Sequence, residues 1–347
     1  MHGGPTAALA AALLFGAGAP AAKALLGGVD PTLLAGLLYL GSGITLGLAR
    51  VALRPDAARF ARGDWLWLAS AILAGGIVAP TLLLWGLTRT SASTASLLLV
   101  LEAPLTAVWA RLLFAEHLGR RTVQAIGLMT VAGMLTIGLY GRAGDSLGLA
   151  AIALACTAWA LDNNLTREVA HGDAVTVAAL KGLVGGSVNV TAALVLGAHV
   201  PRLGIVVAAG VVGAASYGLS LVLYVISLRG LGAARTAAYF AAAPFAGAMA
   251  SVVVLGEPTT WRLAAAAALT ALAVWRLVGE LHRHRHRHEA LEHFHVHGHD
   301  EHHRHAHAEG DVAGAHAHWH RHEAQEHDHP HAPDVHHRHG HRPGGGT

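Results

Sequence analysis

The chain has 347 residues, of which 53% are hydrophobic and 13% are charged, and its formal net charge at pH 7 is +3. The charged residues avoid apolar blocks of about 20 residues, the length that spans a bilayer. This composition excludes a soluble globular protein and indicates an integral membrane protein.

Ten apolar blocks follow one another along the chain, and each predicts a membrane-spanning helix. They lie close to residues 6–26, 31–52, 64–87, 92–114, 121–140, 147–166, 174–197, 203–228, 234–255 and 260–279. Their connections are short, so we expect a compact helical bundle. The N-terminus has no basic start, so we expect an uncleaved first helix. Cys156 is the only cysteine and lies in an apolar block, so we interpret it as a packing residue.

The stretch from Trp85 to Leu118 has a weaker copy from Ile226 to Pro258. Each copy contains a short basic turn, an apolar helix with an internal proline, and a closing glutamate. The corresponding residues are Pro104 with Pro244 and Glu116 with Glu257. We therefore predict two related halves, residues 1–143 and 144–280. Because each half has five spans, an odd number, the second half must be inverted relative to the first.

The positions of lysine and arginine predict the orientation of the bundle. With a cytoplasmic N-terminus, the inner loops contain Arg50, Arg54, Arg59, Arg62, Arg120, Arg121, Arg167, Arg229 and Arg235. The outer loops then contain only Lys23, Arg89, Arg142, Arg202 and Arg262. Cytoplasmic loops carry an excess of basic residues, so we predict that both termini are cytoplasmic.

The composition changes abruptly at Leu281, and the segment 281–347 contains most of the 27 histidines. So polar a segment buries too little surface to offset its ordering entropy, and we predict that it is disordered. It is also a tandem repeat, because residues 288–307 align without gaps to residues 322–341.

The histidines of this tail are candidate ligands for zinc, nickel, cobalt or copper, because neutral imidazole binds these metals. The candidates in the two repeats are His293, His295, His297, His302, His303, His305, His327, His329, His331, His336, His337 and His339. Two alternatives stay open: a solubilising low-complexity tail, or attraction of its arginines to the anionic inner leaflet.

Glu102 lies about ten residues into the fourth apolar block, near the middle of the membrane. A charged side chain there costs on the order of 3 kcal/mol, so it must face protein or a water-filled cavity. We interpret Glu102 as a proton or substrate-cation site. The alternative is a structural carboxylate that is neutral or paired with a neighbouring helix. Lys181 is the candidate partner, unless it extends toward the cytoplasmic face.

Further polar residues and prolines interrupt the apolar blocks. Asp162, Asn163 and Asn164 are adjacent, so they cannot share one helix face, and at least two should point to a cavity or a neighbouring helix. The alternative is a cytoplasmic helix end with capping or interhelical hydrogen bonds. Pro104 and Pro244 free backbone carbonyls, as at transporter binding sites. Asn189 is a further candidate for a pore-lining residue.

Two long strings carry a resemblance to a known family: WALDNNLTR, from Trp159 to Arg167, and LGAARTAAYFAAAPF, from Leu231 to Phe245. Residues 6–279 resemble the EamA family of the drug/metabolite transporter superfamily, and within it a bacterial subgroup marked by these strings. The resemblance implies an all-α membrane protein with ten helices in two inverted five-helix repeats around a central cavity. It also implies export of small metabolites or amino-acid-like compounds, driven by a proton gradient or by exchange.

Our main hypothesis is an exporter of a small metabolite in the bacterial inner membrane, with the lipid bilayer and divalent metals at the tail as further partners. We expect no required cofactor, no enzymatic activity and no nucleic-acid partner, and we leave a homodimer open. Two rival hypotheses are a transporter of transition metals or their complexes, and a membrane-anchored metal buffer or sensor.

Overall fold

The computed structural model describes most of the predicted bundle and four segments of the tail. The described residues are 3–53, 63–114, 120–137, 143–169, 174–231, 239–240, 242–278, 282–288, 291–297, 316–322 and 325–331. They fall into two compact units, Met1–Glu280 and Leu281–Thr347.

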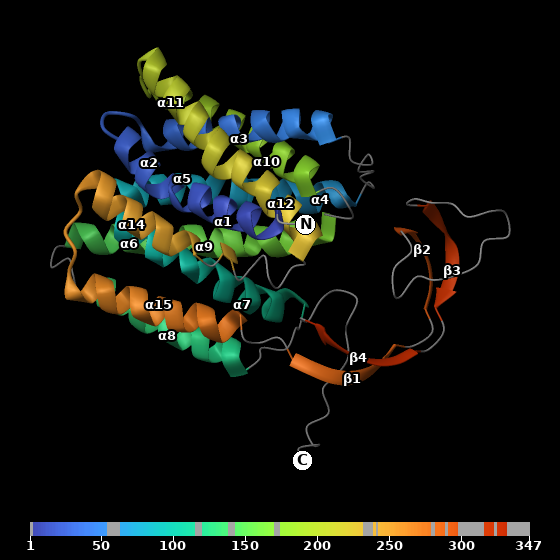
Figure 1. The fold of residues 1–347 in the computed structure, drawn as a ribbon. Coiled ribbons are helices and arrows are strands. Elements are labelled where there is room, and N and C mark those ends of the chain that lie inside the picture. The colour runs from blue at the N-terminus through green and yellow to red at the C-terminus, as the bar shows by residue number, and fades with distance from the viewer. Residues whose placement is uncertain are drawn as a thin grey trace. The chain divides into compact units, whose positions relative to one another are not determined.

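The first unit is a bundle of helices (Figure 1). Its first part contains α1 (Gly3–Gly16), α2 (Gly18–Leu25), α3 (Pro31–Leu53), α4 (Asp64–Ala71), η1 (Ile72–Val78), α5 (Ala79–Leu87), α6 (Ala92–Leu98), η2 (Leu99–Leu101), α7 (Glu102–Phe114) and α8 (Arg120–Ile137). Its second part contains α9 (Ala143–Val169), α10 (Ala174–Val195), α11 (Leu203–Gly213), η3 (Ala214–Leu219), α12 (Ser220–Leu231), α14 (Ala243–Leu255) and α15 (Trp261–Val278).

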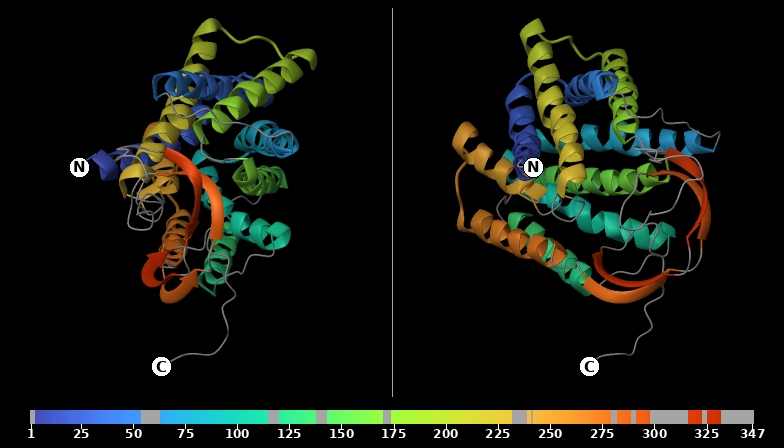
Figure 2. Two further views of the ribbon diagram at one scale, coloured as in Figure 1. Left: turned by 90° about the vertical axis from the view of Figure 1, so that its right-hand side faces the viewer. Right: turned by 45° about the vertical axis from the view of Figure 1, so that its right-hand side comes forward.

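Seven stretches of the described residues are long and apolar enough to cross a membrane. They are Gly4–Leu25, Pro31–Ala52, Asp64–Leu87, Ala92–Phe114, Ser146–Thr166, Val175–Val195 and Leu203–Ser227. Each coincides with a predicted apolar block, and the other three blocks coincide with α8, α14 and α15. The helices α8 and α15 pack side by side at one edge of the bundle (Figure 2).

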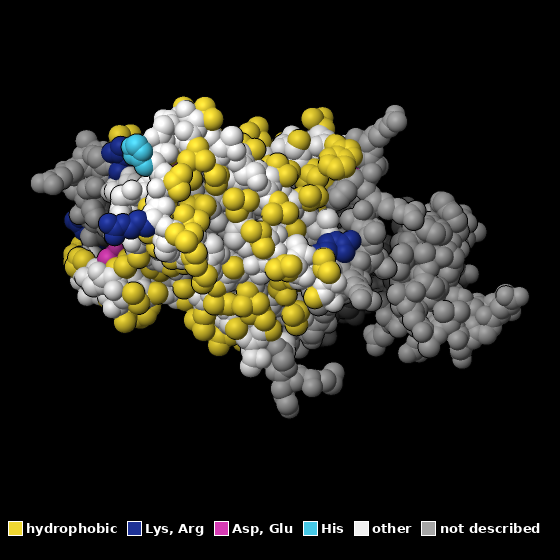
Figure 3. All heavy atoms as spheres, turned by 90° about the horizontal axis from the view of Figure 1, so that it is seen from above, with side chains coloured by type: hydrophobic (Ala, Val, Ile, Leu, Met, Phe, Trp, Pro, Cys, Tyr) yellow, Lys and Arg dark blue, Asp and Glu magenta, His cyan; other side chains and the backbone are white. Residues whose placement is uncertain are grey.

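The surface of the bundle suits lipid. Leu66, Val195 and Leu196 are 75%, 80% and 84% exposed. Figure 3 shows hydrophobic side chains over the middle of one face and basic side chains toward its two ends. Apolar surface of this extent would be unfavourable in water and marks a membrane-facing surface.

Two of the spans contain a π-helical segment in their middle. The segment η1 joins α4 to α5, and η3 joins α11 to α12. The helices α9 and α10 pack against η1, whereas α1 and α3 pack against η3. Because π-segments are rare and concentrate at functional sites, both segments are candidate functional positions.

Glycines allow α3 and α10 to approach closely. A Cβ on Gly36 would lie 2.7 Å from the backbone nitrogen of Val190, and one on Gly182 would lie 2.7 Å from the Cα of Gly43. A Cβ on Gly186 would lie 2.7 Å from the backbone nitrogen of Leu40. Packing drives helix association in lipid, so these glycines fix α10 against α3 and thereby position Lys181.

The second unit contains four strands, β1 (His282–His288), β2 (Leu291–His297), β3 (His316–His322) and β4 (Gln325–His331). β1 pairs antiparallel with β4, with His284 opposite His329, and β2 pairs antiparallel with β3, with His293 opposite His320. These four segments lie in the tail for which the composition predicts disorder, and that disorder stays a prediction.

Candidate functional site

A buried ion pair joins α9 to α10. The Nζ of Lys181 lies 2.5 Å from the Oδ2 of Asp162, and their side chains are 16% and 4% exposed. Thr166 donates to the Oδ1 of Asp162 (2.9 Å) and accepts from Lys181 (3.3 Å). Thr166 can do so because it follows Asp162 by four residues, on the same helix face. The three side chains form a closed polar network.

The carboxylate of Asp162 rests on the backbone of η1. At Gly75 the Cβ of any other residue would collide with this carboxylate. Gly76 packs in turn on Gly185 of α10, where a Cβ on Gly185 would lie 2.6 Å from the carbonyl oxygen of Gly76. The π-segment is therefore held against both helices that supply the ion pair.

Side chains from neighbouring helices bond to the carbonyl groups of η1. The carbonyl of Gly75 accepts from the hydroxyl of Tyr39 (2.8 Å) and from the Nε1 of Trp159 (3.1 Å). The Nε1 of Trp159 also donates to the oxygen of Tyr39 (3.0 Å). In lipid an unsatisfied carbonyl costs several kcal/mol, so these bonds stabilise the π-segment.

Glu102 is the first residue of α7, directly after the 3₁₀ turn η2. Its Oε1 accepts from the Nδ2 of Asn163 (2.7 Å), and its backbone carbonyl accepts from the hydroxyl of Thr106 (2.8 Å). Pro104 has no N–H to offer the carbonyl of Val100, four residues earlier, so the helix is weakened where Glu102 lies.

The structure places the adjacent residues Asp162, Asn163 and Asn164 in contact with two neighbouring helices. Asp162 binds α10, whereas Asn163 binds the side chain of Glu102 on α7. The Nδ2 of Asn164 donates to the carbonyl of Thr106 (3.0 Å). Asn163 is exposed, whereas Asp162 and Asn164 are buried. Interhelical bonds of this kind are expected from both interpretations of these residues, so the role of the three residues stays a prediction.

The structure shows the partners of Lys181 and Asn189, and the first is a correction. Lys181 pairs with Asp162 and not with Glu102, because α9 contacts α10 through Asp162 and α7 through Asn163. Asn189 is 1% exposed in this conformation and donates to the carbonyls of Gly76 (3.3 Å) and Ile77 (3.4 Å), so its role as a pore-lining residue stays a prediction. An amide that satisfies freed carbonyls is expected beside a π-segment.

The two prolines lie near helix starts. Pro104 is the third residue of α7, and Pro244 is the second residue of α14. Pro244 is tolerated in the first turn of α14, where its missing N–H has no helical acceptor to lose. Pro104, by contrast, lies inside the span Ala92–Phe114, where its missing N–H removes a helical bond. Glu116, the counterpart of Glu257, lies outside the described residues.

Among the described residues, no three His, Cys, Asp or Glu side chains are close enough to hold a metal ion. The tail candidates His293, His295 and His297 lie on β2, whereas His327, His329 and His331 lie on β4. These strands belong to different two-stranded sheets. The candidates outside the described residues are His302, His303, His305, His336, His337 and His339.

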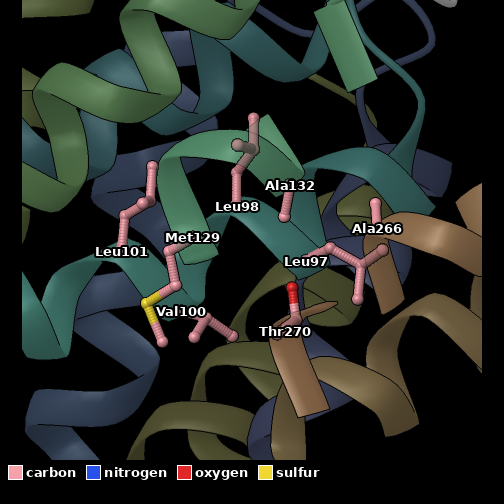
Figure 4. Close-up of a pocket in the computed structure, with 8 residues that line it drawn as sticks. All are labelled: Leu97, Leu98, Val100, Leu101, Met129, Ala132, Ala266 and Thr270. Atoms are coloured by element: carbon pink, nitrogen blue, oxygen red, sulfur yellow. The ribbon is translucent and has the colours of Figure 1, made fainter. Parts of the chain in front are cut away.

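A cavity between α6, η2, α8 and α15 is lined almost entirely by apolar side chains (Figure 4). Its volume is about 10 Å³, which leaves room for about one water molecule. Thr270 is the single polar residue of its lining. This cavity is therefore separate from the charged cluster and too small for a metabolite.

Sequence reasoning missed three participants of the charged cluster. Thr166 could have been found, because it lies four residues after Asp162. Tyr39 is distant in sequence and gave no signal. Gly75 gave no signal either, because the π-segment that brings it to Asp162 has no sequence signature that we recognised.

The comparisons with known proteins agree with this architecture. The model of the EamA-like transporter family matches residues 2–138 and 146–279, which is more than half of the chain. The chain belongs to the EamA-like transporter family. This protein is therefore a multi-pass membrane transporter.

Two individual proteins are also similar to this chain. A curated protein of Methanothermobacter thermautotrophicus, described as an uncharacterized transporter, is 28% identical over 270 residues, covering 72% of this chain and 78% of that protein. A solved crystal structure is 20% identical with a TM-score of 0.58, and the match covers 79% of this chain and 96% of that one. The latter shows likeness of fold alone.

Proposed function

We propose that this EamA-like transporter is a secondary transporter of the bacterial inner membrane that exports a small metabolite by alternating access. The observation that carries the proposal is the charged cluster of Asp162, Lys181 and Glu102 beside a π-helical break. Ionisable groups in membrane spans are costly and mark substrate or proton pathways. Transporters place such groups at broken helices near the middle of the membrane.

The same proposal includes ten spanning helices in two inverted five-helix repeats, residues 1–143 and 144–280. Two observations support it. The family model matches twice, once in each half. The segments η1 and η3 also interrupt the third span of each half, and each packs on the second span of the other half, α10 or α3. Related halves with exchanged partners are expected of a pseudo-twofold arrangement.

The excess of basic residues in alternate loops supports cytoplasmic positions for both termini. The strings WALDNNLTR and LGAARTAAYFAAAPF support placement in the bacterial subgroup. The substrate is then a small metabolite or an amino-acid-like compound, and the coupling is to protons or to exchange. For the oligomeric state, the proposal leaves a monomer and a homodimer as alternatives.

Glu102 is the proposed coupling residue. In the part of the chain that the structure describes, its carboxylate bonds to the neutral amide of Asn163 and to no cation. Asp162, by contrast, is neutralised by Lys181. Protonation of Asp162 would break its ion pair with Lys181, whereas protonation of Glu102 breaks no ion pair. Glu102 is therefore the better proton carrier.

The other proposed site residues have supporting roles. Asn163 is exposed and donates a hydrogen bond to Glu102, so its amide can exchange that acceptor for a substrate atom. Asp162 and Lys181 pair with each other in this conformation and are proposed to supply further polar contacts to the substrate. Asn164, Asn189, Pro104 and Pro244 shape the helices that carry these groups.

The substitution Glu102→Gln tests the proposal, because it keeps the bond to Asn163 but cannot be ionised. Metabolites released into the medium are compared between cells that express the parent chain, Glu102→Gln or the control Asp30→Asn, which changes a carboxylate at the start of α3. We expect the parent and the control to release a compound that Glu102→Gln does not, at equal amounts in the membrane. Equal release by all three would remove Glu102 from the mechanism.

The histidine-rich tail favours a second candidate function, in which zinc, nickel, cobalt or copper is the cargo or is buffered by the tail. Cellular metal content is measured with the full chain, with a chain that ends at Leu281, and with neither. A change caused by the shortened chain would mean that the helices move a metal or its complex. A change caused only by the full chain would make the tail a buffer, sensor or feeder. No change with either would refute this candidate.

A further inference from the structure

The turn between α5 and α6, residues 88–91, is fixed from both sides by charged residues of other helices. Lys23, in the last turn of α2, donates to the carbonyls of Leu87 and Thr90, the latter at 2.9 Å. Because α5 ends at Leu87, its last carbonyls lack helical donors. A lysine at a helix C-terminus also interacts favourably with the helix dipole.

Glu257 binds the other side of this turn. Its Oε1 accepts from the backbone N–H of Ala92 (2.7 Å) and its Oε2 accepts from that of Ser93 (2.9 Å). The next amide, Thr94, donates to the Oγ of Ser91 (3.3 Å). The first three amides of α6 are thus all bonded, two of them to a carboxylate, which makes charge-assisted bonds.

The backbone at the end of α14 directs Glu257 toward α6. Gly256 ends α14 in the left-handed conformation, with φ of +66°. The N–H of Glu257 then donates back to the carbonyl of Ser251 (3.5 Å). The helix α14 lies in the second match to the family model and α6 in the first. The bonds of Glu257 therefore cross from one half of the protein to the other.

The start of α6 is polar but buried. Ser93, Thr94 and Ser96 are 2%, 1% and 1% exposed. The hydroxyls of Ser96 and Thr90 are buried and find no hydrogen-bond partner among the described residues. A buried hydroxyl without a partner costs free energy, and that cost is recovered when water reaches it. We call this contact between the start of α6 and α14, around Ser93, Ser96 and Gly247, the seam. Buried hydroxyls without partners suit a contact surface that is closed in one conformation and hydrated in another.

The same seam is tightly packed. A Cβ on Gly247 of α14 would lie 2.6 Å from the Oγ of Ser96 and 2.6 Å from the carbonyl oxygen of Gly16. The helices α1, α6 and α14 therefore meet without space between them one turn below Ser93. Nothing as large as a metabolite can pass here in this conformation.

We propose that Glu257 is a latch that holds this end of the transport pathway closed between the two halves. Lys23 stabilises the turn of residues 88–91, which precedes the amides that Glu257 binds. The inference rests on the proposed alternating access, in which contacts between the halves must close at one end when the other opens. Release of Glu257 from the amides of Ala92 and Ser93 is the event that frees α6 from α14.

The accessibility of Ser96 tests the latch without knowledge of the substrate. Cys156→Ala removes the single native thiol, and Ser96→Cys introduces one at the seam. A membrane-impermeant maleimide is applied to right-side-out and to inverted membrane vesicles that contain the full chain. We expect that adding Glu257→Gln raises the labelling rate by about tenfold, from one side of the membrane only, which corresponds to about 1.4 kcal/mol.

Asp30→Asn is the matched control. Asp30 also caps a helix start, accepting from the N–H groups of Thr32 (2.9 Å) and Leu33 (3.0 Å), but it does so within one half. Labelling should stay at the parent rate in this variant. Equal rates in the parent and Glu257→Gln, equal increases in both variants, or an increase from both sides would each overturn the latch.

Ala92→Pro provides a second variant if Glu257→Gln fails to fold. Proline at the first helical position is tolerated, and the preceding Ser91 has φ of −66° and ψ of 148°, which a following proline accepts. The change removes the N–H that binds the Oε1 of Glu257, so the labelling rate should also rise. An unchanged rate would contradict the latch. The labelling result is independent of Glu102→Gln, so failure of the latch and failure of the proposed function are distinguishable.

Discussion

The two polar centres of the bundle use their charges in different ways. In the cluster between α9 and α10, Asp162 and Lys181 neutralise each other. At the turn between α5 and α6, Lys23 and Glu257 instead bind the backbone at two helix ends. A charge that depends on a buried partner cannot be removed alone without leaving that partner uncompensated. When a charge that caps a helix end is removed, only backbone dipoles lose their partner, and these are weaker than a full charge.

The largest expected effect compares two lysines. Lys181→Met leaves the carboxylate of Asp162 buried and unpaired, so it should destabilise the protein by about 3–5 kcal/mol. Lys23→Met removes bonds from a cation to two carbonyls and should cost only about 1–2 kcal/mol. Unfolding midpoints of the purified variants in one detergent measure both. Adding Asp162→Asn should recover part of the loss in Lys181→Met. Equal losses for the two lysines, or no recovery, would break the comparison.

The next effect compares two glycines. Gly75→Ala drives a Cβ into the carboxylate of Asp162, so we expect a loss of about 1–3 kcal/mol. Gly256→Ala meets no atom within 4 Å among the residues that the structure describes, but it must adopt φ of +66°, which costs about 1 kcal/mol. Unfolding midpoints again report the cost. Only Gly256→Ala should also raise labelling at the seam, because it redirects Glu257; a rise in Gly75→Ala would contradict the separation of the centres.

The smallest effect concerns the carbonyl of Gly75. Trp159→Phe removes one of its two side-chain donors and leaves the hydroxyl of Tyr39 in place. We expect a loss of about 1 kcal/mol from Trp159→Phe alone. The double variant Trp159→Phe with Tyr39→Phe should lose more than the sum of the single losses, because the carbonyl is then unsatisfied. Strict additivity would show that water replaces the donors.

The sequence predicted the helices well, because an apolar block long enough to cross a bilayer leaves few alternatives. The blocks near 31–52, 64–87 and 174–197 match described spans to within a few residues. The disorder of the tail stays a prediction, because composition alone carries it.

The site was predicted only in part. Glu102, Asp162 and Lys181 could be found because an ionisable group in an apolar block is conspicuous. Which carboxylate binds Lys181 depends on how α9 packs between α7 and α10, and periodicity does not specify that packing. Asn189 was interpreted as a pore-lining residue because it is a polar residue in an apolar block. Its acceptors are carbonyls of a π-segment that the sequence does not predict.

The most direct test of the central claim, that Glu102 couples transport, separates gradient-driven flux from exchange. The parent chain and Glu102→Gln are reconstituted in liposomes with the compound identified by the release screen. The account predicts that Glu102→Gln still exchanges labelled for unlabelled compound but no longer concentrates it when a proton gradient is imposed. Concentration of the compound by Glu102→Gln at the parent rate would contradict the account.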